Sequence, residues 1–500
     1  IASKGTSVRL APSRRACSCP SSLRLDRSSR PWMRRSLLKL LRPWRTRSRR
    51  RVTVQRQGAA IVWGKPFRGT IGCSRAHLVS PSSPRQAPVP PWKNLLGALS
   101  LLVAALIWTS GLVNSLSRPS VAPSLNLQQQ EVQLLAEPAL PDTLGSVLRG
   151  GENPRTILKG SLEQIPAADR SWRQTQLLDL LQNEVATVPE IDAADDPLLD
   201  RLLCEARGGA SGDCINPAVA RSSAVRLSVS ALLPLITAVT GTALLLGQGW
   251  RLWRGRRESW PDLKGPTLTL LDMALLVAGG FVVISAVGVP LLVLPLVSRL
   301  TAGLDSPRRE AVGVVINYSV MALPSLLILR RQLASLPKDI TPEGGWLQWR
   351  WRPLSGAFFT ALAGWCKVTP IVVLTGWLLV RLFGDPGGSN PLLELVLDSR
   401  DPLALSLLAL TAVVLAPLFE EVIFRGTLLP VLARRTGSVT GVVLSGLLFG
   451  VAHISIGELA PLTVLGIGLA LVRLSSGRLF PCVLMHALWN AVTFVNLLLL

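Results

Sequence analysis

Long apolar segments recur along the chain, and they constrain its fold more than any other feature. The first runs from Leu95 to Val113, close to the ~20 residues that a helix needs to cross the hydrocarbon core of a bilayer. Eight more follow, at residues 227–247, 270–297, 311–329, 355–382, 403–433, 438–456, 460–474 and 480–500. With 49% hydrophobic residues, the chain is too apolar for an ordinary soluble domain. The pattern predicts an all-α, polytopic helical membrane protein with about nine transmembrane helices and a small helical extramembrane domain.

Hydropathy and charge divide the 500 residues into five regions. These are a basic, disordered tail (1–90), a first transmembrane helix (91–116), a polar extramembrane domain (117–223), transmembrane helices 2–5 (224–399) and a carboxy-terminal membrane core (400–500). The extramembrane region contains helix-favouring runs that are interrupted by glycine-rich turns. We therefore expect it to be mostly helical.

Most of the positive charge lies in the tail. Residues 1–90 hold 21 of the 53 Lys and Arg residues and one of the 30 acids, which gives +20 of the net +23. This composition is typical of an organelle transit peptide, and a basic arm on anionic lipid is an alternative. The first methionine is Met33, so we favour a third interpretation, in which the tail precedes the native start. No nucleic-acid-binding fold is recognisable, and we expect no nucleic-acid partner.

Basic loops predict how the helices are oriented. The tail and the loops near residues 251–257, 330–352, 434–435 and 473–478 all carry Lys or Arg, which places them on the cytoplasmic side, or the stromal side in an organelle. The expected location is the bacterial inner membrane, or a plastid or other organelle membrane if the tail is a transit peptide. An outward loop with Arg299, Arg308 and Arg309 is an exception.

The predicted orientation places the polar domain on the outer side. Cys204 and Cys214 lie in this domain, and an oxidising compartment would allow them to pair. We favour two free thiols over the disulfide.

Two acids and a guanidinium interrupt the apolar run "APLFEEVIFRGTLLP". Each charge inside a membrane costs about 2.5–3.5 kcal/mol, so a compensating partner and a function are expected. Glu421 and Arg425 are four residues apart on a helix, in the favourable order for an ion pair. Glu420 projects about 100° away from Glu421 and is the candidate for chemistry. Lys367, a charge in another span, is expected to be structural, paired with a carboxylate or extended to the interface.

Two of the three histidines lie in the last spans. Glu420 lies 17 residues before Gly437 and His453 lies 16 after it, so an antiparallel hairpin turning at Gly437 would bring both to the same depth. Gly441, Gly446 and Gly450 on the second helix would let the two helices of that hairpin approach closely.

His486 and Asn490 are four residues apart on the last helix and share a face. An imidazole and a carboxamide side by side can donate two hydrogen bonds to one point, as an oxyanion hole requires. Interhelical hydrogen bonding is the alternative for each residue taken singly.

The order of three motifs, EExxxR, FxxxH and HxxxN, resembles the CPBP family of intramembrane glutamic endopeptidases, which are related to the type II CAAX prenyl proteases. The motif residues here are Glu420, Glu421 and Arg425, then Phe449 and His453, then His486 and Asn490. The resemblance covers roughly residues 400–495.

The resemblance implies a role for each motif residue. Glu420 would take a proton from water and His453 would orient that water. His486 and Asn490 would stabilise the oxyanion, and Glu421 and Arg425 would support the site. The implied substrate is a membrane-associated polypeptide, and no cofactor or metal is expected.

Three other functions remain open. Two Glu and two His could ligate zinc, although the chain has no HExxH motif and Asn is a poor zinc ligand. Acids and histidines at membrane depth also mark transporters, but those spread their polar groups over two related halves. The third alternative is a non-catalytic scaffold or immunity-type protein that retains the fold.

Overall fold

The structure is a computed structural model that describes residues 90–118, 120–141, 153–182, 196–256, 258–385 and 387–500. Residues 1–89 of the predicted tail lie outside these ranges. The described residues are helical and contain no strand, and eight helical segments are long and apolar enough to cross a membrane, which confirms the predicted fold class. They are α1 (Pro91–Ser115), α7 (Pro217–Trp253), α8–η2–α9 (Leu270–Leu300), α10 (Arg308–Ala334), α11 (Leu354–Phe383), α13–α15 (Pro402–Thr436), α17 (Ile456–Ser476) and α18 (Phe480–Leu499).

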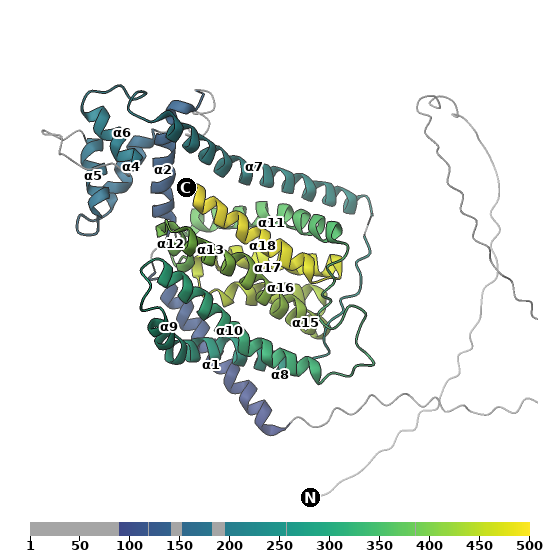
Figure 1. Ribbon diagram of the computed structural model, residues 1–500. Coiled ribbons are helices and arrows are strands. Elements are labelled where there is room, and N and C mark those ends of the chain that lie inside the picture. Colours follow the sequence, from purple (N-terminus) through teal and green to yellow (C-terminus); the bar gives the residue numbers. More distant parts are fainter. Residues whose placement is uncertain (1–89, 119, 142–152, 183–195, 257, 386) are drawn as a thin grey trace, which may run out of the picture. The chain divides into compact units, whose positions relative to one another are not determined.

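The ninth predicted span, α16 (Ser438–Ala452), is shorter than the others. Its 15 residues extend for about 22 Å, less than the ~30 Å of a hydrocarbon core. It packs between α15 (Leu429–Thr436) and α17, while α11, α17 and α18 lie side by side (Figure 1). Its C-terminal end is at His453, which is partly buried.

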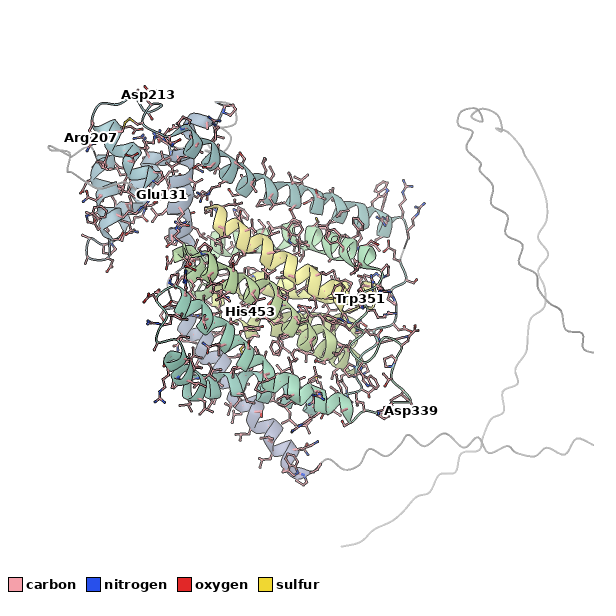
Figure 2. All side chains as sticks on the ribbon, viewed as in Figure 1. Glu131, Arg207, Asp213, Asp339, Trp351 and His453 are labelled. Atoms are coloured by element: carbon pink, nitrogen blue, oxygen red, sulfur yellow. A yellow bond between two sulfur atoms is a disulfide. The ribbon has the colours of Figure 1, made fainter. Side chains whose placement is uncertain are left out.

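Hydrogen bonds join the predicted basic loops at one end of the helices. The guanidinium of Arg434 donates to the carbonyl of Pro266, and Arg473 Nη2 donates to the carbonyl of Lys264 at 2.7 Å. Figure 2 shows Trp351 and Asp339 at this end and Glu131 and Asp213 at the other. The loops therefore share one end of the helices, as predicted; which side of the membrane this is stays a prediction.

The hairpin predicted around Gly437 is present. Gly437 has φ +88°, ends α15 and precedes α16. The close approach predicted at three glycines is confirmed for Gly441, where a Cβ would lie 2.7 Å from the backbone nitrogen of Ala433 on α15. It was wrong for Gly446 and Gly450, which face α17 and not the preceding helix. A Cβ on Gly446 would lie 2.9 Å from the backbone nitrogen of Ile467. Gly441 therefore allows α16 to approach α15, and Gly446 and Gly450 allow it to approach α17.

The extramembrane domain is a set of short helices around a leucine core. It comprises α2 (Ala122–Ala136), η1 (Glu137–Ala139), α4 (Pro154–Gln164), α5 (Trp172–Gln182) and α6 (Pro197–Ala206). Asp196 caps α6 and binds Arg173, which also donates twice to Glu131 at 2.8 Å. Burial acts to raise the pKa of Asp196, but the hydrogen bonds from Arg173 and from the cap lower it below its ordinary value.

The preference for free thiols in this domain was wrong. Cys204 and Cys214 form a disulfide, with their Cα atoms 5.5 Å apart. The physical reason is a turn: the amide of Gly209 bonds to the carbonyl of Cys204, and the amide of Cys214 bonds to that of Ala210. These bonds turn the segment between the two cysteines back on itself, so that residues ten apart in the sequence meet. The sequence spacing alone does not reveal this turn.

Lys367 also has an unexpected partner. Its Nζ donates to Gln248 Oε1 at 2.9 Å, so a neutral amide on α7 receives it and not a carboxylate. This bond joins α7 to α11.

Candidate functional site

The helix that carries Glu420 is not a regular α-helix. Two π-helical segments, η3 (Leu410–Leu415) and η4 (Val422–Leu428), flank the short α14 (Ala416–Glu421). In the π register a carbonyl pairs with the amide five residues later, and for Ala412 that residue is Pro417, which has no N–H. Asn490 Nδ2 donates to the Ala412 carbonyl at 2.7 Å instead. This hydrogen bond connects the irregular helix that carries Glu420 to α18.

Glu421, Arg425 and His486 form a buried group. Arg425 Nη1 lies 2.7 Å from Glu421 Oε1, and both side chains are 0% exposed, so the predicted ion pair is confirmed. His486 Nδ1 lies 3.0 Å from the same oxygen. Since a carboxylate accepts, Nδ1 carries the proton in this bond. Glu421 therefore orients His486 and also balances the charge of Arg425.

Phe449 packs against all three basic side chains of the site. Its ring lies 4.3 Å from the guanidinium of Arg425 and has edge contacts with the rings of His453 and His486, at 4.8 and 5.5 Å between centroids. Phe449 is fully buried. An aromatic face stabilises a desolvated cation, and its edge fixes the two imidazoles.

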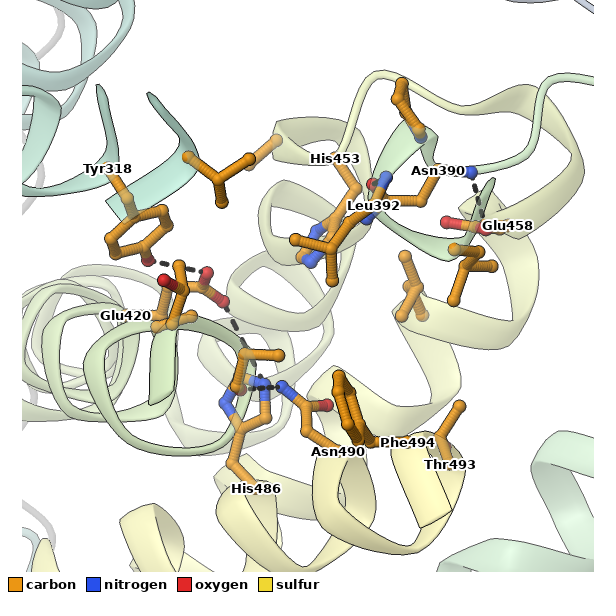
Figure 3. A pocket seen from close by; sticks show the side chains of 18 of the residues that line it. Tyr318, Asn390, Leu392, Glu420, His453, Glu458, His486, Asn490, Thr493 and Phe494 are labelled. Carbon is orange, nitrogen blue, oxygen red and sulfur yellow. Dashed lines mark hydrogen bonds and ion pairs between the residues drawn. The ribbon is translucent and has the colours of Figure 1, made fainter. Parts of the chain in front are cut away.

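Glu420 faces a cavity of about 660 Å³ that His453, His486 and Asn490 also line (Figure 3). Its side chain is 14% exposed, and its Oε2 lies 4.0 Å from His486 Nε2. The four predicted residues are thus brought around one space. They come from α14, from the end of α16 and from α18. No ion pair joins Glu420 to Arg425 among the described residues.

His453 lies at the C-terminal end of α16, and a hydrogen bond to a carbonyl of this helix fixes the tautomer of its imidazole. Nδ1 lies 2.8 Å from the carbonyl of Phe449, which can only accept, so Nδ1 is protonated and Nε2 is left as an acceptor. The next residue, Ile454, has φ +52°, which is strained for a β-branched side chain. The guanidinium of Arg118 donates to its carbonyl, and the amide of Ile456 donates to Ser115 Oγ at 3.0 Å.

Two residues of the cavity were missed from the sequence. The hydroxyl of Tyr318 on α10 donates to Glu420 Oε1 at 3.0 Å. Glu458, in the first turn of α17, accepts from the amide of Asn390 at 3.3 Å and lies on the far side of the cavity from Glu420 (Figure 3). Tyr318 is the single tyrosine of the chain, which is a signal that could have drawn attention to it. Glu458 follows a capping serine, Ser455, and reads as an ordinary helix start.

The arrangement does not resemble a metal site. Within the ranges that the structure describes, no group of three or more His, Cys, Asp or Glu side chains is placed to hold an ion. Glu421 is engaged by Arg425 and His486, and Asn490 by a backbone carbonyl. What the cavity offers is the Glu420 carboxylate beside two imidazoles, with the Glu458 carboxylate on its far side.

Comparison with known proteins gives two family matches. Residues 402–492 match the model described as type II CAAX prenyl endopeptidase Rce1-like, and this supports assignment of the region to the CPBP/CAAX protease family. Residues 122–193 match a domain of unknown function, DUF8675. Neither the curated proteins nor the solved structures gave a match to the chain. The first match contains Glu420, His453, His486 and Asn490 but not Tyr318.

Proposed function

We propose that this integral membrane protein, whose residues 402–492 match a CAAX-type endopeptidase family, hydrolyses a peptide bond of a membrane-associated polypeptide. The observation that carries the proposal is the position of Glu420. Its carboxylate opens into a cavity that it shares with two imidazoles, inside a bundle of membrane-spanning helices. A carboxylate and an imidazole that face one space can activate a water molecule without a nucleophilic side chain.

In the proposed mechanism Glu420 takes the proton of the attacking water. His453 accepts a second hydrogen bond from that water at Nε2, because its Nδ1 is already committed to the Phe449 carbonyl. The new C–O bond forms at the carbonyl carbon of the peptide, and the proton held by Glu420 passes to the leaving nitrogen as the C–N bond breaks.

Asn490 and His486 would stabilise the oxyanion. One N–H of the Asn490 amide is used on Ala412, which leaves the second for the reaction. His486 donates from Nδ1 to Glu421, so its Nε2 can donate only as an imidazolium. The proposal therefore requires protonated His486 in the reacting complex, with Glu421 as its counter-charge.

The experiment compares newly formed protein termini in membranes from cells that carry the wild type or Glu420→Gln. Termini that depend on the wild type are expected, since removal of a general base lowers rates by about 10²–10⁴-fold. Glu394→Gln is the control, because Glu394 is exposed on α12 (Pro391–Asp398) and does not line the cavity. Identical termini in all three samples would contradict hydrolysis. Activity that a chelator abolishes and zinc restores would contradict the glutamate mechanism.

A further inference from the structure

Ile454, the residue after His453, has a backbone conformation that its own side chain disfavours. Its φ of +52° lies in the left-handed region, which β-branched residues avoid. A residue stays in such a conformation only where its surroundings hold it there. Ile454 separates the end of α16 from the start of α17, so a change in this turn would shift the end of α16 and the imidazole of His453.

The contacts that hold Ile454 come from α1 and the segment directly after it. The side chain of Ile454 fits against Gly111, where a Cβ would come within 2.3 Å of Ile454 Cγ2. The carbonyl of Ile454 accepts a hydrogen bond from the guanidinium of Arg118. Two residues later, the amide of Ile456 donates to Oγ of Ser115, which is fully buried. One helix end therefore fixes the side chain and the carbonyl of Ile454 and an amide of the same turn.

A glycine loop holds the backbone of Arg118 in turn. The carbonyl of Arg118 accepts from the amide of Gly388 at 3.0 Å, and the carbonyl of Gly388 accepts from Ser455 Oγ at 2.6 Å. Gly388 has φ +73°, and a Cβ there would lie 2.6 Å from the carbonyl oxygen of Ser115, so only glycine fits. The turn after His453, the glycine loop and the segment after α1 thus form a closed ring of hydrogen bonds.

We propose that Arg118 is a positioning residue for the reaction, which holds His453 at the cavity by keeping Ile454 in its strained conformation. This inference rests on the proposed function, because His453 needs an exact position only if the cavity activates water. Arg118 does not line the cavity, so it acts through the turn and not on the reacting atoms. It is also close enough to act electrostatically on Glu458, and the two effects can be separated by experiment.

The first test is hydrogen exchange of the full-length protein in lipid nanodiscs, which needs no substrate. Arg118→Met is expected to speed exchange of the Ile456 amide about tenfold, because the turn loses a charged hydrogen-bond donor. Arg309→Met is the matched control, since Arg309 is exposed and its Nε also donates to a backbone carbonyl, that of Leu304 at 2.9 Å. Equal exchange of Ile456 in the wild type and Arg118→Met would overturn the inference.

The second test is the kinetics of cleavage of a polypeptide whose new terminus depends on the wild type. Arg118→Met is expected to lower kcat about tenfold and to leave KM within about twofold, because a displaced imidazole impairs the reaction and not the binding. Arg309→Met should retain both constants. An unchanged kcat in Arg118→Met, or an equal loss in Arg309→Met, would overturn the inference.

Two backgrounds separate the hold on the turn from the electrostatic effect. Glycine adopts a positive φ freely, so in an Ile454→Gly background Arg118→Met should lower kcat by less than about threefold. In a Glu458→Gln background the charge is absent, and the loss of about tenfold should remain. The opposite pattern would assign the effect to Glu458 and overturn the inference.

The two tests also distinguish this inference from the proposed function. Faster exchange of the turn in Arg118→Met, without any cleavage by the wild type, would support the positioning of His453 and contradict hydrolysis. Cleavage by the wild type, with exchange and kcat unchanged in Arg118→Met, would overturn the inference and leave hydrolysis intact.

Discussion

Glu420 and Glu421 are adjacent in sequence, but their environments differ. Glu421 is fully buried and holds Arg425 and His486, whereas Glu420 opens into the cavity and accepts one hydrogen bond from Tyr318. The difference follows from the ~100° between successive residues of a helix.

Replacing Tyr318 by Phe is expected to impair the proposed base without unfolding the protein. The hydroxyl bonds to the carboxylate that would accept the proton, so its loss should lower kcat about tenfold, leave KM nearly constant and move the acid limb of the pH–rate profile to higher pH. The measurement is the pH dependence of cleavage. Ser319→Ala, at an exposed neighbour, is the control. An unchanged pH profile with lower stability would indicate a structural role only.

Replacing Arg425 by Met should strongly destabilise the protein. The change leaves Glu421 charged and buried, which costs about 3–5 kcal/mol. Denaturant unfolding in detergent measures the loss of stability. The double variant Glu421→Gln, Arg425→Met should recover part of this loss. Arg308→Met is the control, because Arg308 pairs with Asp401 at the surface, and little change is expected there.

The elements that build the site are irregular or closely packed. Two π-helical segments flank Glu420, and α16 is short and ends at His453. The turn after His453 is held by hydrogen bonds to Arg118 and Ser115. Together these contacts hold His453 at the cavity, at the end of a helix too short to span a bilayer.

Gly446→Ala is expected to disturb this packing. The added Cβ would lie 2.7 Å from Ile467 Cγ1 and 2.9 Å from the carbonyl oxygen of Thr463, so α16 and α17 must separate. Overpacking of this kind costs about 1–3 kcal/mol and should reduce activity together with stability. The control is Gly247→Ala on α7, where nothing lies within 4 Å. Equal melting temperatures for the two variants would contradict the close approach.

The helices of the extramembrane domain should lose stability in acid. The pKa values of Asp196 and Glu205 are lowered in the folded domain, because hydrogen bonds from arginines outweigh burial. Their contribution is therefore complete above the unfolded pKa values of about 4 and is lost as the pH falls through the folded ones. Hydrogen exchange of α5 and α6, corrected for intrinsic rates, measures the effect. Arg173→Gln should weaken the pH dependence.

At the scale of the whole molecule, segments outside the family-matched region complete the site. Residues 402–492 supply the acids, imidazoles and amide, but α10 supplies Tyr318, α12 lines the cavity, and α1 leads into Arg118. The extramembrane domain packs on α7, and Arg226 of α7 bonds to the last two carbonyls of the chain. The matched region is therefore embedded in helices that the match does not include.

The orientation of the molecule can be tested through its disulfide. If the domain of residues 117–223 faces the oxidising side, a membrane-impermeant maleimide added to that side should label Cys214 in a Cys204→Ser variant and leave the wild-type pair unlabelled. Intact cells or sealed vesicles and a mass shift provide the measurement. Labelling only after the membrane is permeabilised would reverse the predicted topology.

The sequence by itself determined the features that depend on period and local spacing. Apolar length identified the helices, and the positions of Gly437, Glu421 and Arg425 were enough to predict a hairpin and an ion pair. These are contacts within one helix or across one short turn, for which sequence distance fixes spatial distance.

Only the tertiary structure decided the contacts between distant helices. Tyr318 lies 102 residues from Glu420 in the sequence, and Arg118 lies 336 residues from Ile454. Gly446 packs against α17 and not against the preceding helix. The Cys204–Cys214 pair was decided by a turn whose backbone bonds leave no trace in spacing. Such contacts depend on how helices rotate and pack against one another, and the side-chain period of a single helix does not encode that rotation.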